Sequence, residues 1–230
     1  MKTIGLIGGM SWQSSKFYYE YLNQIVADTL GGSHSARILM SSVDFAIIEK
    51  LSFEDNWAEI GKLMAIEAKR LEDAGADVII LGSNTINMVS NYITAAVAIP
   101  FIHIAQATGE AIKRRGVKRV GLLGTKFTME KDFYTKMLEE DFGLEVTIPN
   151  VEDRDTVHTI IYQELAKGVF TESSKKKCLS IIENMTAQGA DGIILGCTEL
   201  PILIPEDEID APSFDTTMIH SKAAVKFVLN

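Results

Sequence analysis

An internal duplication constrains this chain more than any other feature of its sequence. Residues 74–83 (AGADVIILGS) recur as residues 188–197 (QGADGIILGC). Residues 4–8 (IGLIG) recur in the same relative place as residues 120–124 (VGLLG). The first pair differs at its last position, where Ser83 stands in one copy and Cys197 in the other. Two equivalent turns therefore present a hydroxyl and a thiol.

A third, weaker pair of segments extends the repeat. Residues 99–103 (IPFIH) are echoed by residues 211–215 (APSFD), and a helical pattern follows each. Three landmarks in the same order and at nearly the same spacing predict an internal duplication. Repeats of this size are domains rather than solenoid units. We predict two homologous lobes that face each other: residues 1–105, whose last helix is free to cross over, and residues 106–230.

The alternation of short apolar runs with longer amphipathic stretches predicts the fold class. Strands are expected at residues 3–7, 37–43, 78–81, 101–104, 120–123, 145–148, 192–195 and 213–215. Helical patterns lie between them, as at residues 57–74, where Ile60, Met64 and Leu71 fall on one face. Such alternation is typical of parallel sheets with right-handed crossovers. The predicted class is α/β, with two pseudo-symmetric lobes that are each a parallel sheet flanked by helices.

Composition excludes several classes of partner. The chain has 230 residues, 47% of them hydrophobic, which is enough to bury a sizeable core. Its net charge of −9 and its lack of long basic blocks argue against nucleic acid and against an anionic membrane surface. No apolar run approaches the roughly 18 residues that a membrane span needs, and the apolar start of the chain is read as a strand rather than a targeting peptide. We expect a cytoplasmic protein, and a homodimer on base rates.

Metal and nucleotide sites are not predicted. The two cysteines, Cys178 and Cys197, and the four histidines show no ligand spacing. The glycines of residues 5–9 are not followed by the Lys of a phosphate loop, and their spacing is not that of a dinucleotide fingerprint. We therefore expect no metal and no cofactor.

Small polar residues follow several predicted strands. In parallel sheets the ligand sits beyond the carboxyl ends of the strands. Those ends read GGMSW at residues 8–12, SSVD at 41–44, GSNT at 82–85, GTKFT at 124–128 and GCTE at 196–199. Backbone N–H groups and hydroxyls in such turns cap helices or bind an anion, a carboxylate in particular.

Cys197 is the most reactive residue predicted here. It directly follows a buried strand at an expected helix start, where the helix dipole and nearby N–H groups favour a thiolate. Glu199, two positions on, either takes a proton from the thiol or opposes thiolate formation, and the sequence leaves both readings open. Cys178 lies on a Lys-rich helical pattern and is expected to be an inert core residue.

Three motifs resemble those of the aspartate/glutamate racemase family. They are Gly8-Gly9-Met10, Ser83-Asn84-Thr85 and Gly196-Cys197-Thr198-Glu199, and the resemblance covers essentially the whole chain. It implies an active site between two lobes and racemisation of an amino-acid substrate without a cofactor. In that family one cysteine thiolate removes the α-proton while the other thiol protonates the opposite face. Here Ser83 and Cys197 take those catalytic positions.

The resemblance also implies the substrate-binding residues. The implied substrate-binding set is Met10, Asn84, Thr85, Thr125, Thr128, Thr198 and Glu199.

The chain departs from the family in two ways, at Ser83 and in the residues that set specificity. A hydroxyl is a much weaker acid than a thiol, whose reference pKa is about 8.5, so racemisation is expected to be asymmetric. Members with acidic substrates carry an arginine after the second strand, which residues 41–48 lack, and a lysine near residues 162–168, where Lys167 lies out of register. A neutral polar amino acid is therefore an alternative to aspartate or glutamate.

Two other functions fit the same residues. One is a malonate-type decarboxylase that uses a single cysteine, here Cys197, as its proton donor. The other is a racemase-like protein that binds an amino acid without turning it over, which the replacement of cysteine by Ser83 would favour. Exchange of the α-proton with solvent separates these functions, because only a racemase exchanges and inverts it.

Overall fold

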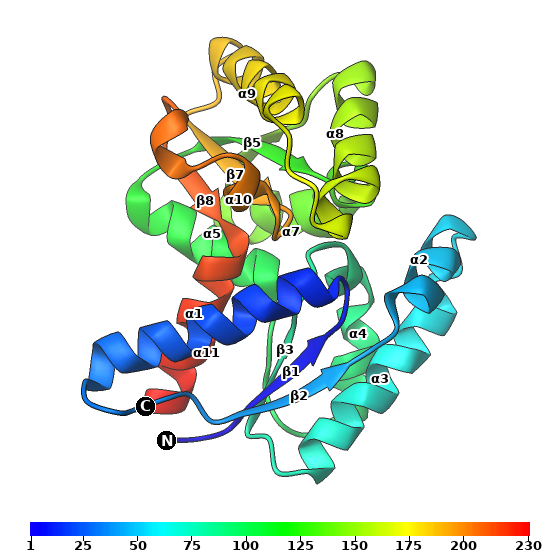
Figure 1. The fold of residues 1–230 in the computed structure, drawn as a ribbon, viewed down its shortest axis with the longest axis vertical. Helices are drawn as coiled ribbons and strands as arrows, with labels where there is room; N and C mark the ends of the chain where they lie inside the picture. The colour runs from blue at the N-terminus through cyan, green and yellow to red at the C-terminus, as the bar shows by residue number, and fades with distance from the viewer. The chain divides into compact units, whose positions relative to one another are not determined.

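The computed structural model describes residues 1–230 as two compact units. Unit 1 comprises Met1–Ile104 with His220–Asn230, and unit 2 comprises Ala105–Ile219. Figure 1 follows the chain through both units, from blue at the N-terminus to red at the C-terminus. None of the helices combines the length and apolar character needed to cross a bilayer.

Unit 1 is built on a parallel sheet of four strands. They are β1 (Ile4–Gly8), β2 (Ile38–Ser42), β3 (Val78–Leu81) and β4 (Phe101–Ile102), in the order β2-β1-β3-β4. The prediction that the fourth strand reaches Ile104 is wrong. Ile104 begins the next helix, and its N–H is bonded to the Asn87 side chain rather than to a strand.

Helices cover both faces of this sheet because its strands are apolar on both faces. They are α1 (Trp12–Leu30), α2 (Phe45–Phe53), α3 (Trp57–Asp73), α4 (Ser90–Ala96), the 3-10 helix η1 (Thr85–Val89) and most of α11 (Thr216–Leu229). Ile4, Leu6, Val78 and Ile80 pack against residues of α1 and α11. Ile7, Ile79 and Leu81 point to the other face, against α2, α3 and α4. Figure 1 shows α1 and α11 on one side of β1, with α3 and α4 on the other.

Unit 2 repeats the same sheet. Its strands β5 (Arg119–Gly124), β6 (Glu145–Thr147), β7 (Gly192–Gly196) and β8 (Ser213–Asp215) are parallel, in the order β6-β5-β7-β8. Its helices are α5 (Ile104–Arg115), α6 (Lys126–Glu130), α7 (Asp132–Phe142), α8 (Val151–Gln163), α9 (Glu172–Ala187) and α10 (Leu200–Leu203), with 3-10 turns η2 (Leu165–Lys167) and η3 (Glu206–Glu208). A Cβ at Gly109 of α5 would clash with the Phe142 ring of α7, so these two helices pack closely.

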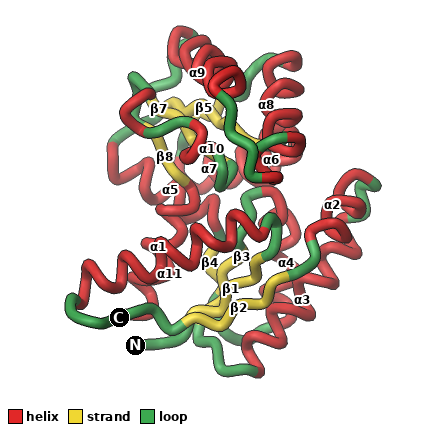
Figure 2. The backbone as a smooth tube through the Cα atoms, in the orientation of Figure 1, coloured by secondary structure: helices red, strands yellow, loops and turns green.

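The duplicated segments occupy equivalent places in the two sheets. Residues 4–8 and 120–124 form the inner strands β1 and β5. Residues 74–83 and 188–197 contain the inner strands β3 and β7. Equivalent hydrogen bonds also recur: Ile79 N–H donates to Pro100 O at 2.8 Å, and Ile193 N–H donates to Pro212 O at 2.9 Å. Figure 2 shows the two sheets in yellow, each with helices around it. The predicted α/β class with two repeated parallel sheets is confirmed.

Candidate active site

The carboxyl ends of the unit 1 strands bring the predicted residues of that unit to one edge. Gly8 pairs with Ser42 across β1 and β2, and Ile7 pairs with Leu81 across β1 and β3. The turns that follow these strands therefore begin at the same level of the sheet, because parallel strands end on the same side. Met10 follows β1, and residues 83–85 follow β3.

Ser83 lies in the turn between β3 and η1. Its side chain is half-buried, and its Oγ accepts a long hydrogen bond from Ile86 N–H at 3.4 Å. Asn84 and Thr85 are buried and form the start of η1. The hydroxyl thus sits beyond the sheet, at the place where the duplication predicts it.

Met10 belongs to the apolar cluster of unit 1. Its side chain is buried with Ile7, Ile48 and Ile86. The chain approaches closely here, since a Cβ at Gly9 would clash with the backbone of Val43. Met10 is therefore placed to form an apolar wall beside the strand ends.

Thr125 and Thr128 lie together after β5 in unit 2. Thr125 caps α6, because its Oγ1 accepts from Thr128 N–H at 3.2 Å. The two hydroxyls are 3.1 Å apart, and both side chains are buried. Gly124, which precedes them, pairs with Gly196 of β7, so these threonines and the Cys197 turn share one edge of the sheet.

Cys197, Thr198 and Glu199 form a buried hydrogen-bonded cluster after β7. The Cys197 Sγ–H donates to Glu199 Oε2 at 3.1 Å, and Thr198 Oγ1–H donates to the same oxygen at 2.6 Å. One carboxylate oxygen therefore holds both the thiol and the neighbouring hydroxyl. A carboxylate so placed is the nearest acceptor for the thiol proton.

The expected effect of the local N–H groups, which favour a thiolate at Cys197, is present but is outweighed by other effects. Burial, and then the Glu199 carboxylate, raise the pKa of the Cys197 thiol well above its usual value. The backbone N–H groups of Glu199 and Leu200 lower that pKa, but they do not outweigh the other effects. The following helix, α10, is only four residues long and offers little dipole. Cys197 therefore rests as a thiol, and Glu199 opposes its ionisation in the free protein.

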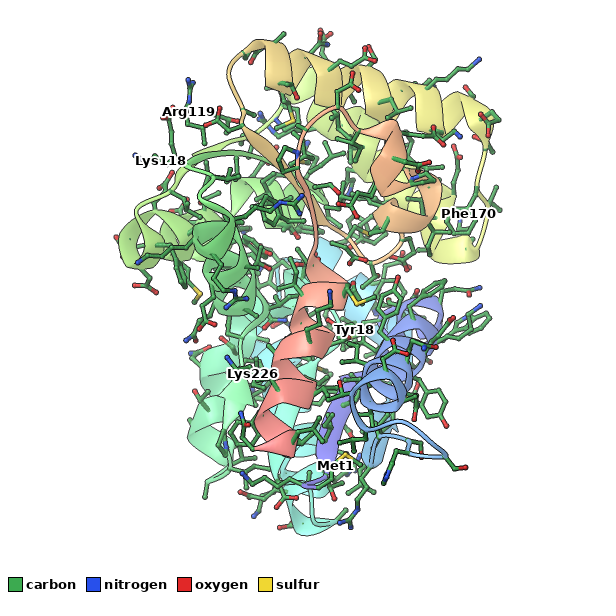
Figure 3. The ribbon with its side chains drawn as sticks, turned by 90° about the vertical axis from the view of Figure 1, so that its left-hand side faces the viewer. Met1, Tyr18, Lys118, Arg119, Phe170 and Lys226 are labelled. Carbon is green, nitrogen blue, oxygen red and sulfur yellow. The ribbon has the colours of Figure 1, made fainter.

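Three of the four histidines are hydrogen-bonded within the fold. His220 Nε2 lies 2.8 Å from Ile102 O, an acceptor, so this nitrogen carries the proton and Nδ1 accepts from the Tyr18 hydroxyl at 2.8 Å. Figure 3 labels Tyr18, on α1 near α11. Burial lowers the pKa of His103 and the pKa of His220 to about 4. His158 accepts the Lys126 N–H through Nδ1 at 3.2 Å, and no group of His, Cys, Asp and Glu side chains is arranged to hold a metal ion.

Cations near the end of β5 are engaged by acidic side chains. Lys126 Nζ lies 2.5 Å from Asp155 Oδ1, and Arg154 Nε lies 2.8 Å from Glu130 Oε1. Lys167 is exposed and donates to Gln163 Oε1 at 3.0 Å. Lys126 was not predicted from the sequence as a residue of this region. Its position directly after Thr125 was the signal that could have indicated it.

Asn87 is a second residue that sequence reasoning missed. It is fully buried, and its side-chain amide donates to Ser83 O at 2.6 Å. Its position four residues after Ser83, in a short segment that follows a strand, was the only signal in the sequence. Burial of an amide is not visible from residue type, because asparagine is usually exposed.

Comparisons with known proteins match this chain over most of its length. A model of the Asp/Glu/Hydantoin racemase family matches residues 7–224. A Yersinia pestis protein, provisionally described as an Asp/Glu racemase, is 45% identical, and its crystal structure covers 100% of both chains with a TM-score of 0.92. An aspartate racemase homologue from Pyrococcus horikoshii is 35% identical over 100% of both chains, with a TM-score of 0.86. The broad specificity amino-acid racemase of Bacillus subtilis is 28% identical over 171 residues, 74% of this chain and 73% of the relative. The chain therefore belongs to the Asp/Glu/Hydantoin racemase family.

Proposed function

We propose that this protein racemises an amino acid by proton transfer at Cα without a cofactor. Family membership supports amino-acid racemisation in general. The observation that carries the proposal within this chain is the buried Cys197 thiol, which donates to the Glu199 carboxylate at the carboxyl end of β7.

In the proposed first step Glu199 accepts the thiol proton and Cys197 removes the α-proton. The free protein holds the thiol protonated, since burial and Glu199 raise its pKa. Proton transfer from sulfur to Glu199 creates the thiolate when the substrate is in place. The thiolate then takes the α-proton, which leaves the electron pair on the substrate as an enediolate.

The second step returns a proton to the opposite face of Cα. Inversion requires an acid and a base on opposite faces, so the proposal assigns this face to Ser83. The Ser83 hydroxyl, or a water that it holds, gives its proton to Cα and regains one from solvent, while Glu199 releases its proton to solvent. Protons therefore balance over one turnover.

The substrate carboxylate is assigned to the hydroxyl and amide residues at the strand ends. Donors aimed at this carboxylate stabilise the charge that grows on it in the enediolate. The proposed donors are Asn84, Thr85, Thr125, Thr128 and Thr198, with Met10 as an apolar wall. We assign substrates of the aspartate or glutamate type, with a neutral polar amino acid as the alternative. Lys126 and Arg154 are held by acidic side chains, which makes neutral substrates worth testing.

Proton NMR in deuterium oxide tests this proposal. L- and D-aspartate, L- and D-glutamate and neutral polar amino acids are each incubated with the protein, and loss of the α-proton and of chirality is followed. We expect exchange with inversion for at least one amino acid, abolished by Cys197→Ala. Cys178→Ala is the matched control, because it removes the other buried thiol of unit 2 and should leave exchange intact.

The other outcomes are distinct. Release of carbon dioxide from a malonate without α-proton exchange of amino acids would identify a decarboxylase. Binding of an amino acid without exchange, even in the Ser83→Cys variant, would identify a binding protein. Either result would overturn the proposed racemisation.

A further inference from the structure

A buried amide lies beneath the turn that carries Ser83. Asn87 is fully buried on η1. Its Nδ2 donates to Ser83 O at 2.6 Å and makes a longer contact with Leu81 O at 3.4 Å. Its Oδ1 accepts from Ile104 N–H at 3.4 Å. One side chain therefore links the end of β3 to the first residue of α5.

The backbone of Asn87 is held as well. The His103 ring donates to the Asn87 carbonyl, and His103 itself is buried after β4. Burial keeps this ring neutral by lowering its pKa to about 4. Asn87 is thus bonded through both its side chain and its main chain to segments that are distant in the sequence.

These hydrogen bonds satisfy backbone groups that lie beyond the end of β3. β3 ends at Leu81, so the carbonyls of the next residues have no strand partner. A buried carbonyl without a partner destabilises the fold, and the Asn87 amide supplies the donor for Ser83 O. The N–H of Ser83 is held separately, because it donates to Leu81 O at 2.9 Å, so the Asn87 amide fixes the carbonyl side of this turn.

We propose that Asn87 is a positioning residue for position 83, and that it sets the direction in which the Ser83 hydroxyl points. The inference rests on the proposed racemisation for its functional meaning. Asn87 touches no reacting atom in this scheme and acts through the Ser83 peptide. A merely structural role would lower stability alone, whereas a positioning role also changes the chemistry at position 83.

Asn87→Asp separates these two roles through pH. A protonated Asp keeps the shape of Asn and can still donate to Ser83 O, whereas an ionised Asp cannot donate and repels that carbonyl. The titratable side chains around this amide are His103 and, beyond it, His220 with its partner Tyr18. With Asn87 present both histidines are neutral above about pH 4, so a transition between pH 5 and pH 9 that only the variant shows reports the new carboxyl group, together with any change that it causes in the ionisation of His103.

The readout is a thiol introduced at position 83 by Ser83→Cys. In that background, iodoacetamide labelling of each thiol is followed by peptide mass spectrometry across pH 5–9, with and without Asn87→Asp. Cys197 of unit 2 is the internal reference in the same sample. Ser52→Ala is the matched control, because it removes a buried hydrogen bond of unit 1, from Ser52 Oγ to Ile48 O at 2.8 Å, on α2.

We expect the pH profile of labelling at position 83 to change in the Asn87→Asp variant, with Cys197 unchanged and no change from Ser52→Ala. In turnover with Ser83 present, Asn87→Asp should lower kcat by about 10²-fold at high pH with little change in KM, and kcat should recover as pH falls. An unchanged labelling profile at position 83, in a folded variant of lower stability, would overturn the inference. If Asn87→Asp does not fold, Asn87→Ala gives the same comparison without the pH arm.

The labelling result does not depend on racemisation. A changed profile at position 83 without α-proton exchange would keep Asn87 as the residue that positions this turn and remove the proposed function. α-Proton exchange with an unchanged labelling profile at position 83 would support the proposed function and remove the positioning role of Asn87.

Discussion

At the residue scale, the proposed chemistry rests on the pairing of a buried thiol with a carboxylate. Cys197 donates to Glu199, and burial together with that carboxylate raises the pKa of the thiol. The same side chain that opposes ionisation in the free protein is therefore the acceptor for the thiol proton in the proposed turnover. The proposal therefore gives Glu199 both of the roles that the sequence left open.

Glu199→Gln tests that double role. Loss of the carboxylate removes one cause of the raised pKa, so the thiolate fraction of Cys197 at pH 8 and its rate of iodoacetamide labelling should rise. α-Proton exchange should nevertheless fall by about 10²-fold or more, because the thiol has lost its proton acceptor. Glu164→Gln is the control, since Glu164 raises the pKa of Cys178 instead. Faster labelling together with undiminished exchange would remove Glu199 from the mechanism.

Cys178 gives a prediction for stability at alkaline pH. Burial and the Glu164 carboxylate raise the pKa of Cys178 to about 12 in the folded protein, against about 8.5 in the unfolded chain. A raised folded pKa stabilises the protein fully below the unfolded value, and that contribution is lost as pH rises through the folded value. The free energy of unfolding should therefore fall more steeply above pH 9 in the wild type than in Cys178→Ala, by about 1.4 kcal/mol per pH unit. Urea unfolding at pH 8.5, 9.5 and 10.5 measures both slopes, and parallel slopes would contradict the assignment.

Residue roles divide into those that the sequence can predict and those that it cannot. The positions of Ser83 and Cys197 after the equivalent strands β3 and β7 were predicted because the duplication aligns them, whereas their catalytic roles belong to the proposal. Asn87 was missed, since a buried amide and a solvated one look the same in a sequence. The net ionisation of Cys197 could not be predicted, because the desolvation that decides it depends on packing from distant segments.

At the scale of elements, apolar periodicity was sufficient to locate the strands but less accurate in predicting where each strand ends. The inner strands of these doubly covered parallel sheets are nearly continuous apolar runs, and the regular alternation with helices located the shorter, more polar outer strands, so all eight were found. The fourth ended two residues early, at Ile102, because the Asn87 side chain takes up the N–H of Ile104. A side-chain acceptor from a distant segment leaves no trace in the local sequence pattern.

The hydrogen bond between Tyr18 and His220 joins α1 to α11 in unit 1, in addition to the apolar packing of Ala224, Val225 and Val228. Tyr18→Phe leaves the buried Nδ1 of His220 without its donor, which should lower the free energy of unfolding by about 1–3 kcal/mol. Amide hydrogen exchange in residues 220–229 should speed up more than in α3. Tyr134→Phe in unit 2 is the matched control, because that hydroxyl is also buried but lies 3.3 Å from its partner Thr108 Oγ1. Equal protection of α11 in Tyr18→Phe and the wild type would contradict this role.

At the scale of the whole molecule, the duplication supplies two equivalent strand ends with unequal chemistry. β3 leads to a hydroxyl at Ser83, and β7 leads to a thiol at Cys197. A thiol with an adjacent carboxylate can act as a base, whereas a hydroxyl of much higher pKa serves only as an acid. Racemisation by this chain should therefore run unequally in its two directions.

The most direct measurement is the initial rate of α-proton exchange in deuterium oxide for the L- and D-forms of the same amino acid, in the wild type and in Ser83→Cys. In the wild type we predict exchange of one enantiomer faster by about 10²-fold or more. In Ser83→Cys the slower rate should rise toward the faster one. Equal rates for both enantiomers in the wild type, or no exchange in either protein, would contradict the account.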